Sequence, residues 1–258
     1  MLIIAFSAVG RRRRPILLVV LLLVTVLSVI RESSDRDVWF PAFAVSMGAI
    51  LVLLSLFLVA ALRYHPAALA ARPRVPAFAA GPNPASVFIA SVLLLQAGFS
   101  LADSIHDIVD GEELWIFGAV PAVLWVFLLV LVWRMAWGWF GVQLRPDGVH
   151  DRQLVGSLFV PWEAFVTAYP AVSDGAQRVA LYYERPELVR RRGLRVGGLH
   201  LPAASIDAGF LAWAIGVYVT HPEYRPAIGT EAELRRLTAP AGAVAGPGKA
   251  DDHGREVG

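Results

Sequence analysis

Four long apolar runs occupy the first 140 residues of this 258-residue chain and constrain its fold more than any other feature. The first covers 15–30, and the others extend over about 42–62, 85–102 and 114–133. A helix needs roughly 20 mostly apolar residues to cross the hydrocarbon core of a bilayer. The first run is short, but the long side chains of Arg14 and Arg31 can extend its span. The sequence therefore predicts a transmembrane domain of four α-helices over 15–140.

The composition agrees with that prediction and excludes several classes of protein. Hydrophobic residues make up 57% of the chain and charged residues only 17%, which departs from ordinary soluble domains. Cysteine is absent, so disulfides, cysteine-ligated metals and thiol nucleophiles are excluded. The formal net charge of +2 is too small to indicate a nucleic-acid partner.

The distribution of arginine predicts how the helices are oriented. Residues 11–14 are four consecutive arginines, and the run that follows them has no small-x-small cleavage site. We therefore expect a retained helix, with removal of a signal sequence as the alternative. The loop at 63–84 is basic and the loops at 31–41 and 103–113 are acidic. The positive-inside rule then predicts a multi-pass protein of the cell (inner) membrane, with a cytoplasmic N-terminus at 1–14 and a cytoplasmic C-terminus.

The loop at 63–84 is rich in proline, which is typical of an extended connection. We expect it to act as a spacer without a fold of its own. Its prolines are Pro66, Pro73, Pro76, Pro82 and Pro84.

After Gly141 the pattern changes to short stretches of period two separated by turn residues, which is typical of antiparallel strands. The segment 145–148 (Arg-Pro-Asp-Gly) predicts a turn between strands at 142–144 and 149–151. Further strands are expected at 155–160, 165–169, 179–183 and 194–201, with Gly197-Gly198 as a bulge in the last.

One helix is expected to close this curved sheet or small barrel. Ser205 is placed to cap it, and Ile206, Phe210, Trp213 and Val217 recur at helical spacing. The apolar part, 208–219, is too short to span a bilayer and is interpreted as a core helix. The tail at 238–258 is rich in Ala, Gly, Pro and charge and is expected to be disordered.

This order of short strands and one C-terminal helix resembles the bacterial pleckstrin-homology-like domains. The resemblance covers roughly 141–220 and depends on Gly148-Val149-His150-Asp151, on Phe159-Val160-Pro161-Trp162-Glu163, and on the segment 221–230 that follows. Such folds usually have seven strands, whereas 141–202 has room for five or six. The resemblance implies that 141–237 is a cytoplasmic α+β domain that acts as a binding or scaffolding module, and it supplies no catalytic residues.

An arginine cluster lies between two predicted strands of this domain, with a local charge of about +3 after Glu184 and Glu187 are subtracted. Near an anionic membrane, basic residues contribute about 1 kcal/mol each, so the cluster is a candidate lipid-binding site. The alternative is a solvated hairpin loop. The cluster consists of Arg185, Arg190, Arg191, Arg192 and Arg195.

An acidic face is the candidate metal site. Asp103, His106, Asp107 and Asp110 lie at i, i+3, i+4 and i+7, so a continuing helix would place them on one side. Three carboxylates and an imidazole could hold a divalent cation, and could serve a metal-dependent enzyme. The alternative, which we favour, is that acidic residues simply populate a non-cytoplasmic loop and that His106 is incidental.

These observations predict a non-enzymatic membrane protein without a cofactor. Its expected partners are the lipid bilayer, an anionic phospholipid and an unidentified protein, and not nucleic acid. No nucleotide-binding, hydrolase or zinc-protease motif occurs in the sequence. The alternative function is a small transporter or channel-like subunit with a regulatory cytoplasmic domain, whose transport would depend on Gln96. We interpret Gln96 instead as a hydrogen-bonding contact between helices.

Overall fold

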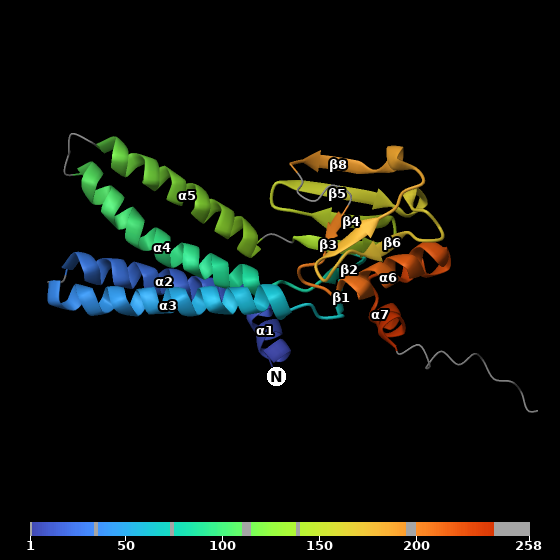
Figure 1. The fold of residues 1–258 in the computed structure, drawn as a ribbon, viewed down its shortest axis with the longest axis horizontal. Helices are drawn as coiled ribbons and strands as arrows, with labels where there is room; N and C mark the ends of the chain where they lie inside the picture. Colours follow the sequence, from blue (N-terminus) through green and yellow to red (C-terminus); the bar gives the residue numbers. More distant parts are fainter. Residues whose placement is uncertain are drawn as a thin grey trace, which may run out of the picture.

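The computed structural model describes residues 2–33, 36–72, 75–109, 115–137, 140–194 and 200–239. The chain forms two units that lie side by side: a bundle of long helices and a unit of β-sheet with two helices (Figure 1). The tail predicted to be disordered falls almost entirely outside the described residues.

The helical unit is organised around α4, which packs against the other helices of the unit. Its close approach to α2 is made possible by Gly98, where a Cβ atom would come within 1.9 Å of Cγ1 of Val24. Phe6 of α1 packs edge-on against Tyr64 and Phe88 and holds α1 to the bundle. The helices are α1 (Leu2–Arg11), α2 (Arg13–Ser33), α3 (Arg36–Arg63), α4 (Pro84–Val109) and α5 (Trp115–Trp137).

The predicted four-helix transmembrane domain is not supported. Among the described residues, one helical segment is long and apolar enough to cross a membrane, Phe43–Arg63 of α3. Within the described residues, the apolar parts of α4 and α5 are Pro84–Gly98 and Ala119–Arg134, each of 10–17 residues, while the helical backbones run from Pro84 to Val109 and from Trp115 to Trp137. The apolar run of α2 is bounded inside the helix by Arg14 and Arg31. The predictions of four transmembrane helices and of a multi-pass inner-membrane protein are therefore wrong.

The sheet unit contains two antiparallel sheets. One has the strand order β1-β2-β3-β4-β5-β8 and the other the order β6-β7-β9. The strands are β1 (Leu69–Arg72), β2 (Ala77–Ala80), β3 (Gly141–Arg145), β4 (Gly148–Arg152), β5 (Gly156–Pro161), β6 (Ala171–Ser173), β7 (Arg178–Leu181), β8 (Arg190–Gly193) and β9 (His200–Pro202).

Most strand predictions are confirmed, and the exceptions are local. The strands at 142–144, 149–151, 155–160 and 179–183 are present as β3, β4, β5 and β7. The segment 165–169 makes one isolated bridge, between Phe165 and Tyr183, and the adjacent strand is β6 instead. Of the stretch 194–201 only the end is strand, and the proposed bulge lies outside the described residues.

The proline-rich loop is not a spacer, because it contributes the β1–β2 hairpin to the larger sheet. β2 pairs with β3, which places Phe78 opposite Leu144. Phe78 is fully buried in the core of the sheet unit. Proline is tolerated at strand ends and turns, and Pro66, Pro76 and Pro82 lie outside the strands. The prolines delimit this hairpin and do not prevent it.

The predicted core helix is confirmed as α6 (Ala208–Thr220), but its fully buried residues are Leu211, Ile215 and Tyr218 among others, whereas Trp213 of the predicted spacing is 50% exposed. Its cap is Asp207 and not Ser205: the backbone N–H of Phe210 donates to Oδ1 of Asp207 at 2.7 Å. A further helix, α7 (Glu231–Thr238), packs against β1. Trp162 contacts Tyr218 across the core, with ring centroids 5.8 Å apart.

Three hydrogen bonds connect the two units near the ends of α3 and α4. Nε2 of Gln177 donates to the carbonyl of Ala61 at 2.9 Å, and Nδ2 of Asn83 donates to the carbonyl of Ala204 at 2.7 Å. The N–H of Asp207 donates to the carbonyl of Pro66 at 3.1 Å. Main-chain carbonyls at the C-terminus of a helix lack partners within the helix, so the bond from Gln177 to Ala61 satisfies one of those of α3 while it joins the units.

Candidate anion-binding pocket

The larger sheet has an apolar inner face and a polar outer face, because side chains alternate along each strand. Leu144, Val149 and Leu158 point into the core and are buried. The residues that alternate with them along each strand point outward, whereas Asp151, which pairs with Val142 and Leu158, lies on the inner face and is buried. Directly paired residues share a face, and the pairing aligns Gln143, His150, Phe159 and Arg190 in one row and Arg152, Ser157 and Arg192 in the next.

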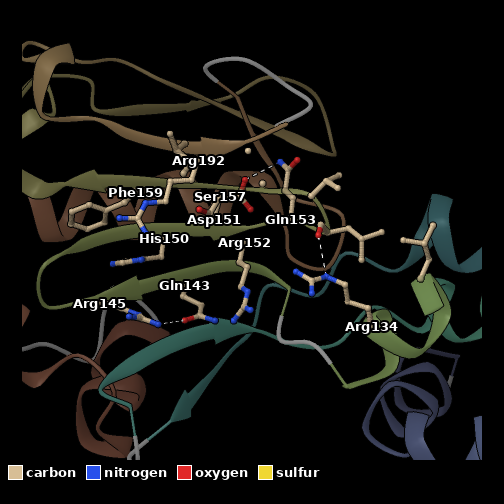
Figure 2. A pocket seen from close by; sticks show the side chains of 16 residues that line it. Arg134, Gln143, Arg145, His150, Asp151, Arg152, Gln153, Ser157, Phe159 and Arg192 are labelled. Atoms are coloured by element: carbon tan, nitrogen blue, oxygen red, sulfur yellow. Dashed lines mark hydrogen bonds between the residues drawn. The ribbon is translucent and has the colours of Figure 1, made fainter. Parts of the chain in front are cut away.

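This outer face and the end of α5 enclose a cavity of about 660 Å³ that opens to solvent (Figure 2). The sheet supplies most of the wall, and α5 contributes Leu131 and Arg134. Small-molecule sites commonly have volumes of about 300–1,000 Å³, so the cavity is large enough for a ligand. Its remaining lining residues are Gln143, Arg145, His150, Asp151, Arg152, Gln153, Leu154, Val155, Gly156, Ser157, Leu158, Phe159, Arg192 and Gly193.

Four arginines from four different elements line the cavity, and one carboxylate lies among the lining residues. The arginines are Arg134 of α5, Arg145 of β3, Arg152 of β4 and Arg192 of β8. The carboxylate belongs to Asp151, which is buried and accepts a hydrogen bond from Nε2 of Gln153 at 3.0 Å. The wall is therefore strongly cationic.

Two of these arginines are held in place by hydrogen bonds. Arg145 donates from Nη2 to Oε1 of Gln143 at 3.0 Å, while its buried Nε has no hydrogen-bond partner among the described residues. The carbonyl of Arg145 accepts from the indole Nε1 of Trp162 at 2.9 Å, which anchors the end of β3 to the core. Arg134 donates from Nε to the carbonyl of Leu154 at 3.3 Å, so the end of α5 contacts the β4–β5 turn.

The cationic surface continues onto β1, at the far edge of the sheet. Burial lowers the pKa of Arg72, and the nearby guanidinium groups of Arg13 and Arg145 lower it further. Arginine remains charged at any physiological pH, so the shift matters because it shows three like charges held close together. Such a concentration of charge raises the local concentration of anions.

His150 lies between the arginines and an aromatic ring. Its imidazole is tilted against Phe159 with ring centroids 4.4 Å apart, and its Nε2 is 3.4 Å from Oδ2 of Asp147. Burial lowers the pKa of His150, as does the positive charge of Arg145, while Asp147 opposes both effects. The imidazole is therefore neutral at pH 7 and can act as a hydrogen-bond donor or acceptor without adding charge.

The predicted arginine cluster is divided by the fold. Arg190, Arg191 and Arg192 are exposed on β8, and the pairing with β5 places Arg190 and Arg192 on the outer face and Arg191 on the opposite one. Of these three, Arg192 lines the cavity. Arg185 is exposed in the turn before the short helix Pro186–Leu188, and Arg195 lies outside the described residues.

Sequence reasoning did not identify Arg134, Arg145, Arg152 or His150 as site residues. The period-two pattern did contain part of the signal, since Gln143, Arg145, His150 and Arg152 occupy the outward positions of one predicted hairpin. Arg134 gave no such signal, because it belongs to the other unit and reaches the cavity only through the packing of α5.

The candidate metal site lies outside the residues whose side chains are described. The backbone of α4 is helical to Val109 and so includes Asp103, His106 and Asp107, while Asp110 is not described at all. Among the side chains that the structure describes, no group of three or more metal-ligating residues occurs. Gln96, interpreted as a contact between helices, is exposed on α4.

Comparison with known proteins gives no relative for this chain: no family model, no curated protein and no solved structure matches it.

Proposed function

We propose that this chain is a non-enzymatic binding protein whose sheet unit holds a phosphate-bearing anion in the outer-face cavity. The observation that carries the proposal is the convergence of Arg134, Arg145, Arg152 and Arg192 on one cavity of about 660 Å³. The guanidinium group presents its donors in a planar fork that fits phosphate or carboxylate oxygens in pairs. Four such groups against one buried carboxylate favour an anionic ligand.

The polar side chains of the cavity favour binding over catalysis. Gln143 holds Arg145, Gln153 holds Asp151, and His150 is engaged by Asp147 and Phe159. These contacts hold the Arg145 guanidinium and the His150 ring in place at the wall of the cavity. Such an arrangement supplies affinity and orientation for a ligand.

An anionic phospholipid is the source of phosphate that best fits the rest of the molecule. Large apolar side chains are exposed along α2, α3 and α5, among them Leu22, Leu51 and Val123. Only 17% of the most apolar window of α3 is buried within the protein. Exposed apolar surface of this extent indicates contact with lipid or with another protein, and α5, one of these helices, contributes Arg134 to the cavity (Figure 2).

The test measures binding by the full chain in neutral detergent micelles, with calorimetry at about 50 and 150 mM salt. One series adds soluble glycerol phosphate, and the other adds phosphatidylglycerol in mixed micelles. Binding of both probes would place recognition in the phosphate group. Binding of phosphatidylglycerol alone would show that the acyl chains are needed. If neither probe binds to folded protein, the proposal is wrong.

Two neighbouring residues of β8 provide a matched pair of variants. Arg192 lines the cavity, whereas Arg191 is equally a part of the exposed strand but faces away from it. We expect Arg192→Gln to weaken binding about tenfold, the loss of one charge-assisted hydrogen bond, and Arg191→Gln to change it less than about twofold. Equal losses in the two variants would mean that the edge strand acts as a diffuse charged surface and not through the cavity.

A further inference from the structure

A second, apolar crevice of about 200 Å³ lies between α2, α4 and α5, on a different face of α5 from the anion-binding cavity. Leu131 and Arg134 face the cavity, while Leu129, Val132 and Trp133 face the crevice. The two sites therefore share a helix but no residue. The crevice is completed by Leu17, Leu18 and Leu21 of α2 and by Leu94 of α4.

The crevice has a closed floor and an open mouth. Leu17, Leu94 and Val132 are buried, and they belong to the hydrophobic cluster that holds α2, α4 and α5 together. Leu18, Leu21 and Trp133 are about half exposed, at 51%, 43% and 57%. A narrow ligand could enter between these three side chains and contact the buried ones.

The end of the crevice near the start of α2 is cationic. Arg14 precedes Leu17 and Leu18 by three and four residues, which places it on the same face of α2. Helical side chains lean toward the N-terminus, so Arg14 extends beyond the apolar wall. Residues 11–14 are all arginine, and the first turn of α2 contains no acidic residue.

We infer that the crevice binds one acyl chain of an anionic lipid, with the phosphate of the lipid next to Arg14. An apolar slot of this kind excludes polar ligands, and its cationic end selects the charge of the head group. The indole of Trp133 suits the same boundary, since it has an apolar body and a polar N–H. This site is additional to the anion-binding cavity and does not depend on it.

The experiment is native mass spectrometry of the full chain released from detergent, with phosphatidylglycerol or phosphatidylcholine of identical acyl chains added. We expect wild-type protein to retain phosphatidylglycerol preferentially. Leu21→Trp fills the mouth and should lower retention of phosphatidylglycerol about fivefold. Leu22→Trp, on the same helix at a position that does not line the crevice and is 65% exposed, should leave it unchanged.

Arg14→Gln tests the charge at the mouth separately from the slot. We expect it to reduce the preference for phosphatidylglycerol about fivefold, the effect of one basic residue near an anionic lipid. The proposal is overturned if wild-type protein retains both lipids equally, or if Leu21→Trp and Leu22→Trp have the same effect.

A fluorescence measurement tests the inference by a different variant, Trp133→Phe, if Leu21→Trp or Arg14→Gln fails to fold. Lipids brominated in the acyl chain quench a tryptophan that they contact. The emission lost in Trp133→Phe relative to wild type reports Trp133, and we expect brominated phosphatidylglycerol to quench that component more strongly than brominated phosphatidylcholine. Equal quenching by the two lipids contradicts the inference.

Discussion

The helical unit and the sheet unit use the same apolar residue types in opposite ways. In the sheet unit, Leu144 and Leu158 are fully buried and charged residues occupy the outer face. In α3, Leu51 and Val52 are 59% and 60% exposed, and the helix is apolar on every side. The comparison shows that apolar content alone does not locate a core. The periodicity of the apolar residues does locate it, because it indicates which face of a helix or strand is buried.

The largest expected difference between the units concerns their cores. Trp162→Ala removes a buried side chain that packs against Tyr218 and Phe165, and should lower the free energy of unfolding by about 3–5 kcal/mol. Leu51→Ala on α3 should change it by less than about 0.5 kcal/mol. Denaturant unfolding of the full chain in detergent measures both. Similar losses would mean that the two units do not differ in this way.

The contact between α2 and α4 depends on Gly98 of α4, because a Cβ atom at this position would have no room beside Val24 of α2. Gly98→Ala places a methyl group against Val24 and should destabilise the protein by about 1–3 kcal/mol, the usual effect of overpacking. Gly48 of α3 has nothing within 4 Å of the same position, so Gly48→Ala should stabilise it by about 0.5–1 kcal/mol. Thermal unfolding of the two variants compares them. A neutral Gly98→Ala would show that α2 and α4 can separate freely.

Tyr218 should make the sheet unit less stable at alkaline pH. Burial raises its pKa, as do the hydrogen bond and the negative charge of Glu233, whose carboxylate accepts from the Tyr218 hydroxyl at 2.9 Å. Near pH 10 the tyrosine ionises in the unfolded chain and stays neutral in the folded one, so the unfolded state binds fewer protons and stability falls as pH rises.

The loss attributable to this tyrosine should reach about 1.4 kcal/mol by pH 11. Subtracting the pH profile of Tyr218→Phe from that of wild type isolates it from other groups. A difference profile that is flat between pH 9 and 11 would contradict the burial of a neutral phenol.

The smallest effect concerns His150 in the anion-binding cavity. Because burial and Arg145 lower its pKa, protonation below pH 6.5 is opposed in the folded state, and its contribution to stability is lost as pH falls. A bound anion favours the protonated imidazole of His150. Sulfate keeps the same charge between pH 5 and pH 7, so it should bind about two- to threefold more tightly at pH 5 than at pH 7. His150→Asn should abolish this pH dependence, as measured by calorimetry; persistence of the dependence would assign it to another group.

The strands were predictable because their apolar residues alternate over a few residues. Val142 and Leu144, with Val149 across the predicted turn, gave both the hairpin and its buried face. The β1–β2 hairpin was missed because Leu69 and Phe78 stand among prolines and alanines, and only pairing with β3, more than 60 residues later, gives them a core.

The site was less predictable than the fold. Its arginines come from α5, β3, β4 and β8, and no local pattern joins residues so far apart in the chain. The consecutive arginines at 190–192 were predicted to form one site because they are adjacent in sequence. Neighbouring side chains of a strand, however, point to opposite faces of the sheet. One of those three lines the cavity.

The sequence by itself determined the local structure: apolar helices in the first half of the chain, an antiparallel region after Gly141, and the core helix α6. These follow from spacing along the chain, since the hydrogen bonds of a helix and the direction of side chains in helices and strands are set by neighbouring residues. Only the tertiary structure decided that residues 69–80 complete the sheet and that Arg134 reaches across to the cavity. These outcomes depend on which surfaces pack together, and packing joins residues whose separation in sequence carries no signal.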